Sequence, residues 1–233
     1  MSLPKVLVFT VTYDGKDYCL DKFLEGLKSL NYPNYKHIFI DNSEDDSYSK
    51  KLSSMGYDVV HVDRAENTRA GIAKSQNVAR RMAIDGDYDY MMSLESDILP
   101  PKDCIQRLVS HGKDVVTGLY HIGDLAKGQR VPCITLKSWN ETLGAYGTRL
   151  LAADEWAKYI YNGLQRVEAG GFGCCMIHNS VFKEIGFYYF DEHQGHSDIF
   201  FFNDCFRRKI AVYVDTNIVC EHDNQIWANI KNR

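Results

Sequence analysis

The chain has 233 residues, of which 45% are hydrophobic and 25% charged. These proportions are typical of a folded globular protein and exclude a mainly disordered chain, and the length suits one α/β domain with or without a small appendage. The formal net charge is −4 and no long run of basic residues occurs, which argues against a nucleic-acid partner.

Neither a membrane segment nor a disulfide is expected. No stretch is apolar over the ~18 to 20 residues that cross a membrane, and the apolar run before Asp14 is too short for a signal peptide. We therefore expect a cytoplasmic protein. The seven cysteines are odd in number and include no Cys-x-x-Cys pair, so we expect reduced, mostly buried thiols.

The first part of the chain alternates strand and helix patterns. The apolar, β-branched run at 6–11 predicts a strand that is covered on both faces. Apolar residues at 20, 23, 24, 27 and 30 share one face of a helix, which Asn31 and Pro33 end. Further strands are expected at 35–41, 57–62 and 88–94, and further helices at 43–51 and 68–85, the second of them capped by Asn67 or Thr68.

This alternation predicts right-handed βαβ units in a Rossmann-like α/β fold, with a mostly parallel central sheet flanked by helices. Ligands of such sheets bind at the carboxyl ends of the strands. The segments that follow the expected strands are 12–14, 41–43, 63–64 and 95–97, and acidic side chains dominate them.

The second part of the chain is less regular. Strands are expected at 115–120 and 174–177, the latter preceded by a glycine turn, and helices at 153–164, 179–185 and 197–209. Residues 123–147 show little periodicity and predict a long excursion, in which 133–136 is the best candidate strand. Two short strands are expected at 212–214 and 218–220.

The sharpest chemical feature is the pair of carboxylates, Glu95 and Asp97, directly after an apolar strand. Carboxylate oxygens hold hard divalent cations while leaving coordination positions for phosphate. Acidic residues also begin turns and helices, so the pair by itself leaves both interpretations open.

The order of motifs from about residue 5 to residue 222 resembles that of the GT-A glycosyltransferases, especially family 2. The matching pieces are the first two strands with Tyr32-Pro33 between them, the helix from Thr68 to Arg80, Glu95-Ser96-Asp97 in the place of the Asp-x-Asp motif, the glycine loop from Gly170, Ser197-Asp198 in the place of the Glu-Asp motif, and the last strands with His222. Glu95 and Ser197 depart from the family pattern, and the second departure leaves Asp198 as the only carboxylate of its pair.

The resemblance implies one GT-A domain over residues 1–233, with a nucleotide-sugar-binding half at 1–99 and an acceptor-binding, catalytic half at 100–233 that includes a small acceptor-side subregion. It implies metal-dependent transfer, with Mn²⁺ or Mg²⁺, from a UDP- or GDP-linked sugar to a hydroxyl of a carbohydrate or other acceptor.

The resemblance also assigns roles to single residues. The implied metal ligands are Asp97 and His222, and Asp198 is the implied general base of an inverting reaction. The residues implied at the nucleotide sugar are Thr12, Tyr13, Asp41, Arg69, Glu95 and Ser96. Those implied at the donor sugar and acceptor are Gly170, Gly171, Trp156 and His196.

Several of these residues have a plainer interpretation. Asp198 is also placed to cap its helix, Asp41 to form a turn, and Arg69 to lie in solvent. The segment 191–198, with His193 and His196, suggests either a mobile polar loop with Gly195 as hinge or a zinc site. Tyr120, His121, Trp139 and Trp156 belong either to the core or to an acceptor wall.

Three alternatives to the leading function remain at this point. A retaining glycosyltransferase shares the metal site but needs no base. A nucleotidyltransferase usually carries a glycine-rich basic loop after the first strand, whereas residues 12–17 contain one glycine and two acids. A non-catalytic nucleotide- or carbohydrate-binding module is disfavoured by the joint presence of Asp97, Asp198 and His222. The oligomeric state stays open.

Overall fold

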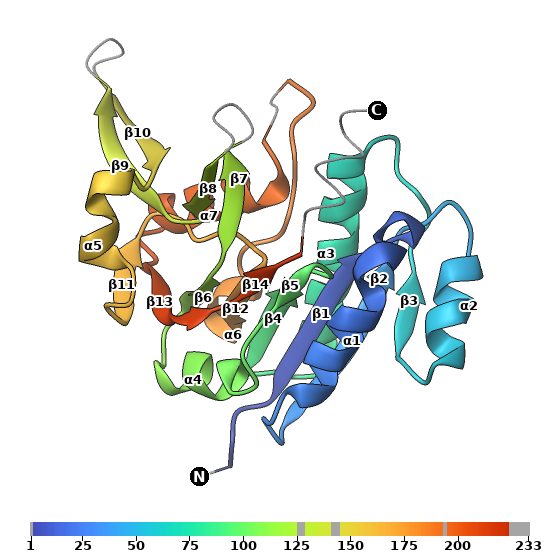
Figure 1. The fold of residues 1–233 in the computed structure, drawn as a ribbon. Coiled ribbons are helices and arrows are strands. Elements are labelled where there is room, and N and C mark those ends of the chain that lie inside the picture. Colours follow the sequence, from blue (N-terminus) through green and yellow to red (C-terminus); the bar gives the residue numbers. More distant parts are fainter. Residues whose placement is uncertain (1, 125–128, 141–144, 193–194, 224–233) are drawn as a thin grey trace.

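The computed structural model describes residues 2–124, 129–140, 145–192 and 195–223. Within them, eight strands form one central sheet flanked by helices (Figure 1). Its order is β11 (Leu164–Val167), β13 (Val212–Val219), β6 (Val115–Leu119), β12 (Cys174–His178), β4 (Tyr90–Leu94), β1 (Val6–Thr12), β2 (Tyr35–Asp41) and β3 (Val59–His61).

The sheet is mostly parallel, as the sequence predicts. β1 pairs in parallel with β2 and β4, β2 with β3, and β13 with β6. β12 is antiparallel to both of its neighbours, β4 and β6, and the edge strand β11 is antiparallel to β13. The carboxyl ends of β1, β2, β4, β6 and β13 therefore lie along one edge of the sheet.

Alternating side chains of β1 build a core on each face of the sheet. Val6 and Val8 pack toward α1 (Leu20–Ser29), α2 (Ser47–Ser54) and α4 (Cys104–Ser110). Leu7 and Phe9 pack toward α3 (Thr68–Asp85), α6 (Asn179–Phe182) and α7 (Ser197–Arg207). Because both faces are covered, every side chain from Val6 to Thr10 is buried, which confirms the prediction of a strand covered on both faces.

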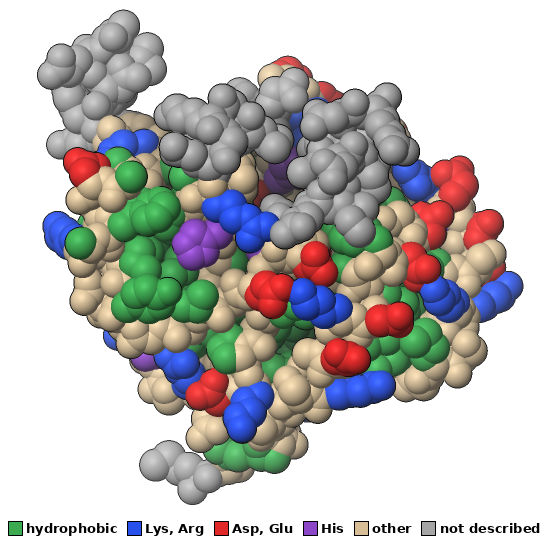
Figure 2. Space-filling model, in the orientation of Figure 1, with side chains coloured by type: hydrophobic (Ala, Val, Ile, Leu, Met, Phe, Trp, Pro, Cys, Tyr) green, Lys and Arg blue, Asp and Glu red, His purple; other side chains and the backbone are tan. Residues whose placement is uncertain are grey.

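The structure confirms two features of the early helices that the sequence predicted. The predicted apolar face of α1 is buried through Leu20, Phe23, Leu24 and Leu27. The Asn67 side chain caps α3 by accepting a hydrogen bond from the Ala70 backbone N–H at 2.9 Å. Acidic and basic side chains are interspersed on the face seen in Figure 2, in keeping with the small net charge.

The irregular segment after β6 contains two hairpins. β7 (His121–Asp124) pairs with β8 (Gln129–Pro132), and β9 (Thr135–Asn140) pairs with β10 (Ala145–Leu150). The prediction of one helix over 153–164 is wrong. The segment instead forms a 3-10 turn, η2 (Ala153–Glu155), and a short helix, α5 (Trp156–Tyr159), before β11 begins at Leu164. Tyr161 and Gly163 have φ angles of 59° and 72°, a left-handed backbone that no helix continues through.

The two short strands expected near the end of the chain are one strand, β13, with a bulge. The register of β13 against β6 shifts between Asp215, which pairs with Gly118, and Val219, which pairs with Leu119. After the bulge, β14 (Glu221–His222) pairs with β5 (Ile98–Leu99), and the Asp223 backbone N–H donates to the Asp97 carbonyl at 2.8 Å. The bulge thus turns the chain across the carboxyl end of β4.

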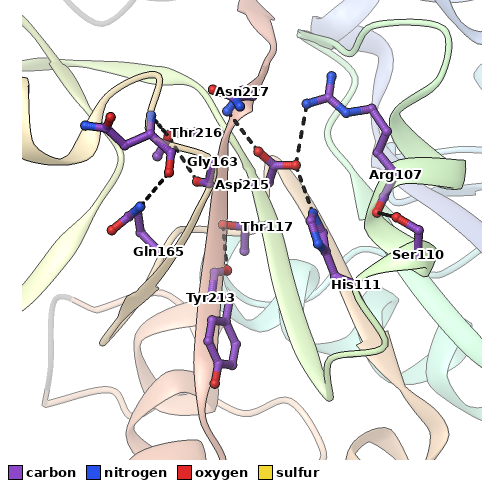
Figure 3. Close-up of polar contacts among 11 residues, drawn as sticks. Arg107, Ser110, His111, Thr117, Gly163, Gln165, Tyr213, Asp215, Thr216 and Asn217 are labelled. Atoms are coloured by element: carbon purple, nitrogen blue, oxygen red, sulfur yellow. Dashed lines mark hydrogen bonds and ion pairs between the residues drawn. The ribbon is translucent and has the colours of Figure 1, made fainter.

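The bulge is held by a polar cluster around Asp215, which is 4% exposed (Figure 3). Its Oδ1 accepts the Asn217 backbone N–H at 2.9 Å, and its Oδ2 lies 2.9 Å from His111 Nε2 and 3.5 Å from an Arg107 guanidinium nitrogen. Thr216 is bound to the other side of the strand, because its backbone N–H donates to the Gly163 carbonyl at 3.0 Å. Contacts on both sides fix the path of the bulge.

The expectation of reduced thiols is confirmed: all seven cysteines are free, and all but the half-buried Cys133 are buried. Among the described residues, no helix has both the length and the apolar character needed to cross a membrane.

Candidate active site

Asp97 lies at the centre of a cluster at the carboxyl edge of the sheet. It follows β4 and is 4% exposed. Its Oδ2 lies 2.5 Å from Lys16 Nζ and 3.8 Å from His222 Nε2. Lys16 belongs to a 3-10 helix after β1, η1 (Asp14–Cys19), and His222 belongs to β14. The fold thereby joins three segments that are far apart in the sequence.

The backbone fixes the orientation of the His222 ring. His222 Nδ1 lies 2.8 Å from the carbonyl oxygen of His121, so Nδ1 carries the proton that it donates there. Its ring also packs edge-on against Tyr120, with centroids 5.7 Å apart. Nε2 is left facing Asp97, which is how a backbone carbonyl commonly orients a metal-binding histidine.

Opposite charges determine how this cluster ionises. Burial alone would raise the pKa of Asp97, but its hydrogen bonds and ion pairs with His222 and Lys16 outweigh burial and lower that pKa to about 2. Burial would lower the pKa of His222, and the contact with Asp97 reverses this, so the pKa of His222 is raised. Asp97 is therefore a carboxylate at neutral pH, with Lys16 on one side and His222 on the other.

Glu95 adds a second acidic group to the cluster. Its side chain is accessible from the solvent, yet the surrounding protein and the charges of Asp97 and Asp198 raise its pKa to about 7. Its backbone N–H donates to the Gly173 carbonyl at 3.0 Å, which links the motif to the glycine loop. The carboxylates at this edge repel one another, and this repulsion favours a site that gains a cation.

Asp198 lies in the first turn of α7. The helix begins at Ser197 with His196 at the N-cap position, so Asp198 does not cap it as the plainer interpretation supposed. The Asp198 carboxylate accepts the Ile199 backbone N–H at 2.8 Å, and burial raises its pKa. The Ser197 hydroxyl donates to Gln76 Oε1 at 2.5 Å, which anchors this end of α7 to α3.

The glycine loop packs tightly on the end of β6. A Cβ atom at Gly170 would lie 2.1 Å from Thr117 Oγ1, and one at Gly171 would lie 2.1 Å from the Tyr120 hydroxyl oxygen. Gly171 also has a φ angle of 71°, which favours glycine. The two glycines are needed for this close approach, and they bring the loop beside Glu95.

Of the residues predicted at a nucleotide, three lie next to the Asp97 cluster. Thr12 is buried at the end of β1, directly before Tyr13, and its carbonyl accepts the Asn42 backbone N–H of the neighbouring chain segment at 3.0 Å. Tyr13 comes next, and burial raises its pKa while the charges of Lys16 and Asp97 also act on it. Ser96 is buried, and its carbonyl accepts from the Cys19 thiol at 3.2 Å.

Asp41 is fully buried and its carboxylate is engaged within the protein. Oδ1 accepts the Ser43 backbone N–H at 3.0 Å and the Ser43 hydroxyl at 2.6 Å, and Oδ2 accepts the Ser49 hydroxyl at 2.5 Å. This is the turn geometry considered as its plainer role, and a contact with a nucleotide base stays a prediction. Arg69 is half-buried in the first turn of α3, and His196 is exposed.

A cavity of about 360 Å³ opens beside His222, lined by His121, Arg130, Trp156, Cys220, Glu221 and His222. The Trp156 ring meets His121 edge-on at 6.4 Å. Its Nε1 is buried and finds no hydrogen-bond partner among the described residues.

Asp97 and His222 fit a divalent cation whose coordination is completed by a ligand. Two atoms bound to one ion at about 2.0–2.2 Å lie roughly 3 to 4.3 Å apart, and the 3.8 Å between Asp97 Oδ2 and His222 Nε2 falls in this range. Within the described ranges, no three His, Cys, Asp or Glu side chains converge as a ready-made metal site. A divalent cation that also binds substrate phosphates commonly has only one or two protein ligands, because phosphate oxygens and water fill its remaining coordination positions.

Sequence reasoning missed Lys16, which makes the shortest contact to Asp97. A single lysine in a turn forms no motif, but its position just after β1 placed it at the ligand-binding edge. The zinc interpretation of 191–198 depends on His193, which lies outside the described residues, as does the side chain of Trp139.

The chain matches the model of a protein family described as glycosyl transferase family 2, over residues 7–187. No protein of curated function matches the sequence.

Three solved structures share the fold. The crystal structure of GalNAc-T7 with UDP, GalNAc and Mn²⁺ is 13% identical, has a TM-score of 0.63, and aligns with 94% of this chain and 43% of its own. A mannosyltransferase, PcManGT from Pyrobaculum calidifontis, with GDP-Man and Mn²⁺, is 15% identical with a TM-score of 0.60, over 95% of this chain and 57% of its own. TarS 1-349 of S. aureus in complex with UDP-GlcNAc is 14% identical and has a TM-score of 0.56. The alignment covers 95% of this chain and 56% of the TarS chain. This chain thus spans only about half the length of these structures.

Proposed function

Because the chain belongs to glycosyl transferase family 2, we propose that it transfers a sugar from a UDP- or GDP-linked donor to a hydroxyl group of a carbohydrate or other acceptor. The observation that carries this proposal is the cluster of Asp97, Glu95, Asp198 and His222 at the carboxyl edge of the parallel strands. The similar structures that contain UDP or GDP-Man with Mn²⁺ support a nucleotide sugar and a metal for this chain.

Asp97 and His222 are the proposed ligands of Mn²⁺ or Mg²⁺. The bond from His222 Nδ1 to the His121 carbonyl leaves Nε2 available to a cation, and the lowered pKa of Asp97 keeps it ionised. A cation held there would stabilise the negative charge that develops on a departing nucleoside diphosphate. Thr12, Tyr13 and Ser96 are proposed to line the neighbouring nucleotide-sugar site, with Asp41 and Arg69 beyond them.

Asp198 is the proposed general base of an inverting reaction. It lies in the first turn of α7 without capping it, and burial raises its pKa, which makes it a stronger base than an ordinary carboxylate. The charge of Asp198 raises the pKa of Glu95, so the two groups are near enough to face one substrate. The acceptor hydroxyl would lose its proton to Asp198 as it attacks the sugar.

The cavity beside His222 is the proposed acceptor site. An aromatic ring, Trp156, and a guanidinium, Arg130, line it, and rings and planar cations suit the faces and hydroxyls of sugars. The buried Nε1 of Trp156 supplies a hydrogen-bond donor that lacks a partner among the described residues. We extend this to a division of one domain, in which residues 1–99 bind the nucleotide sugar and 100–233 bind the acceptor and supply the base.

The test is a panel of UDP- and GDP-linked sugars incubated with the protein and Mn²⁺ or Mg²⁺, with release of nucleoside diphosphate as the measurement. We expect release from at least one donor, loss of it with EDTA, and loss of it in Asp97→Asn. NMR of the anomeric centre of the product then reports inversion or retention. Absence of both binding and release across the panel would refute the proposed function, and retention would refute the role of Asp198.

A further inference from the structure

The ammonium group of Lys16 is the nearest cation to the proposed metal site. Lys16 Nζ lies 2.5 Å from Asp97 Oδ2, with the two side chains 18% and 6% exposed. The same oxygen, Oδ2, faces His222 Nε2 at 3.8 Å. One carboxylate oxygen is therefore the meeting point of the lysine and the histidine.

We propose that Lys16 acts as a built-in counter-ion that competes with the divalent cation for Asp97, and so determines how tightly the site binds metal. This inference rests on the proposed function, because it takes Asp97 and His222 as the metal ligands. Metal binding then requires that Lys16 leave Asp97, and Lys16 sets the affinity of the metal site.

Electrostatics make the two cations exclusive. Like charges a few ångströms apart repel strongly in a partly buried setting, because the effective dielectric constant there is well below that of water. A monovalent ammonium that already neutralises Asp97 removes part of the attraction that a divalent cation would feel. The ion pair therefore lowers metal affinity for as long as it persists.

The position of Lys16 allows it to leave. Lysine carries a compact charge on a flexible four-carbon stem, and the Lys16 side chain retains some exposure to solvent. Its backbone is held in η1, where its N–H donates to the Tyr13 carbonyl at 2.9 Å. The side chain can thus change partner while the backbone of η1 stays in place.

The direct test measures Mn²⁺ binding without a sugar donor, from the electron paramagnetic resonance signal of free Mn²⁺. Lys16→Met keeps the length of the side chain and removes its charge, and we expect its dissociation constant for Mn²⁺ to fall by at least about tenfold. Lys16→Arg keeps the charge and should bind Mn²⁺ no more tightly than the unaltered protein.

A matched control is Lys22→Met, which removes the same charge from an exposed ion pair with Glu221 and Asp223. Because exposed pairs are well screened, its Mn²⁺ affinity should change by no more than about twofold. If Lys22→Met and Lys16→Met increase Mn²⁺ affinity equally, the increase comes from the change in net charge alone, and the proposal is overturned.

Thermal unfolding provides a second readout that does not depend on activity. In EDTA, Lys16→Met should unfold at a lower temperature than the unaltered protein, because Asp97 has lost a buried partner. Mn²⁺ should then raise its melting temperature by more than it raises that of the unaltered protein. An equal Mn²⁺ shift in the two proteins would count against competition.

Asp97→Asn separates this inference from the proposed function. If Asp97→Asn loses Mn²⁺ binding while Lys16→Met leaves it unchanged or weaker, competition by Lys16 is refuted and the metal site stands. If Asp97→Asn binds Mn²⁺ as the unaltered protein does, or if neither protein binds it even with UDP or GDP present, the metal site and the inference fail together.

Discussion

Two buried aspartates of this protein have the same kinds of direct partner but differ in the charges and hydrogen bonds around them. Asp97 and Asp215 are each 4% exposed, and each faces one histidine and one permanent cation. Asp97 has Lys16 at 2.5 Å and His222 at 3.8 Å, whereas Asp215 has His111 at 2.9 Å and Arg107 at 3.5 Å (Figure 3).

The difference lies in what else surrounds each carboxylate. Asp215 also accepts the Asn217 backbone N–H, and its two side-chain partners, Arg107 and His111, are one turn apart at the end of α4. Asp97 has the carboxyl of Glu95 nearby, which the charge of Asp198 also reaches, and its partners Lys16 and His222 come from two separate segments. An aspartate with a cation and a histidine is therefore not by itself a sign of function. An excess of negative charge beside a cavity is the feature that distinguishes Asp97.

The largest expected effect is on catalysis, and of the two aspartates it concerns Asp97 and not Asp215. Asp97→Asn removes a charge that the proposed metal needs, so we expect kcat/KM for sugar transfer to fall by about 10³-fold. Its circular dichroism should stay near that of the unaltered protein, because Asn has nearly the same shape, whereas its melting temperature should fall, because Lys16 loses its charged partner. Retained activity in Asp97→Asn would remove the distinction between the two aspartates.

Asp215→Ala should act on stability instead. It leaves Arg107 and His111 without their buried partner, and breaking such a pair costs about 3 kcal/mol of unfolding free energy. Urea denaturation at neutral pH measures this loss. The folded fraction should still bind Mn²⁺ in stoichiometric amount, and a loss of unfolding free energy below about 1 kcal/mol would contradict the role assigned to this cluster.

The two histidines form a matched pair for a smaller effect. His222→Gln should weaken Mn²⁺ binding by at least about tenfold, since Nε2 is a proposed ligand. His111→Gln should leave Mn²⁺ binding unchanged and lower the unfolding free energy by about 1 kcal/mol through a weakened hydrogen bond. Mn²⁺ titration and urea denaturation of both variants give the comparison, and exchanged phenotypes would reverse our assignment.

The most gradual effect concerns acid stability, and it arises at neither aspartate. Burial lowers the pKa of His37 to about 3, so the unfolded chain takes up this proton first as the pH falls below about 6.5. The unfolding free energy should therefore decrease between pH 6.5 and 4, by about 1.4 kcal/mol per pH unit at most. Asp97, with its lowered pKa, contributes a loss only below its unfolded value, near pH 3.8.

His37→Gln isolates this contribution. Its Nε2 lies 3.0 Å from the Thr10 hydroxyl, a bond that a glutamine can partly replace. The variant should show a flatter dependence of unfolding free energy on pH between 6.5 and 4. An unchanged slope would mean that other groups cause the acid sensitivity.

The sequence predicted the parts of the fold that depend on local patterns. β1, the apolar face of α1 and the Asn67 cap of α3 each follow from spacing or residue type within a few positions. The hairpins between 121 and 150 and the β13 bulge depend on contacts with distant segments, such as that between Thr216 and Gly163. No local pattern reports such contacts, and this is why β13 was expected as two strands.

The candidate site shows the same division. Glu95, Asp97 and His222 were found because motif order pointed to them, and the fold brings Asp97 and His222 together. Lys16 carries no motif, and its importance appears only when η1 lies against the end of β4. The burial of Asp41 among Ser43 and Ser49 was likewise invisible in a linear pattern that suits a turn or a ligand site equally.

The number of residues in the β13 bulge determines which way His222 faces, although loops elsewhere usually tolerate changes in length. Side chains of an extended strand alternate between its two sides, and β14 begins soon after the bulge with His222 facing Asp97. Deleting a single residue between Asp215 and Val219 would leave the β13 and β6 pairing before the bulge intact and would turn His222 away from Asp97. Natural or engineered homologues that keep this site should therefore tolerate replacements in the bulge more readily than deletions.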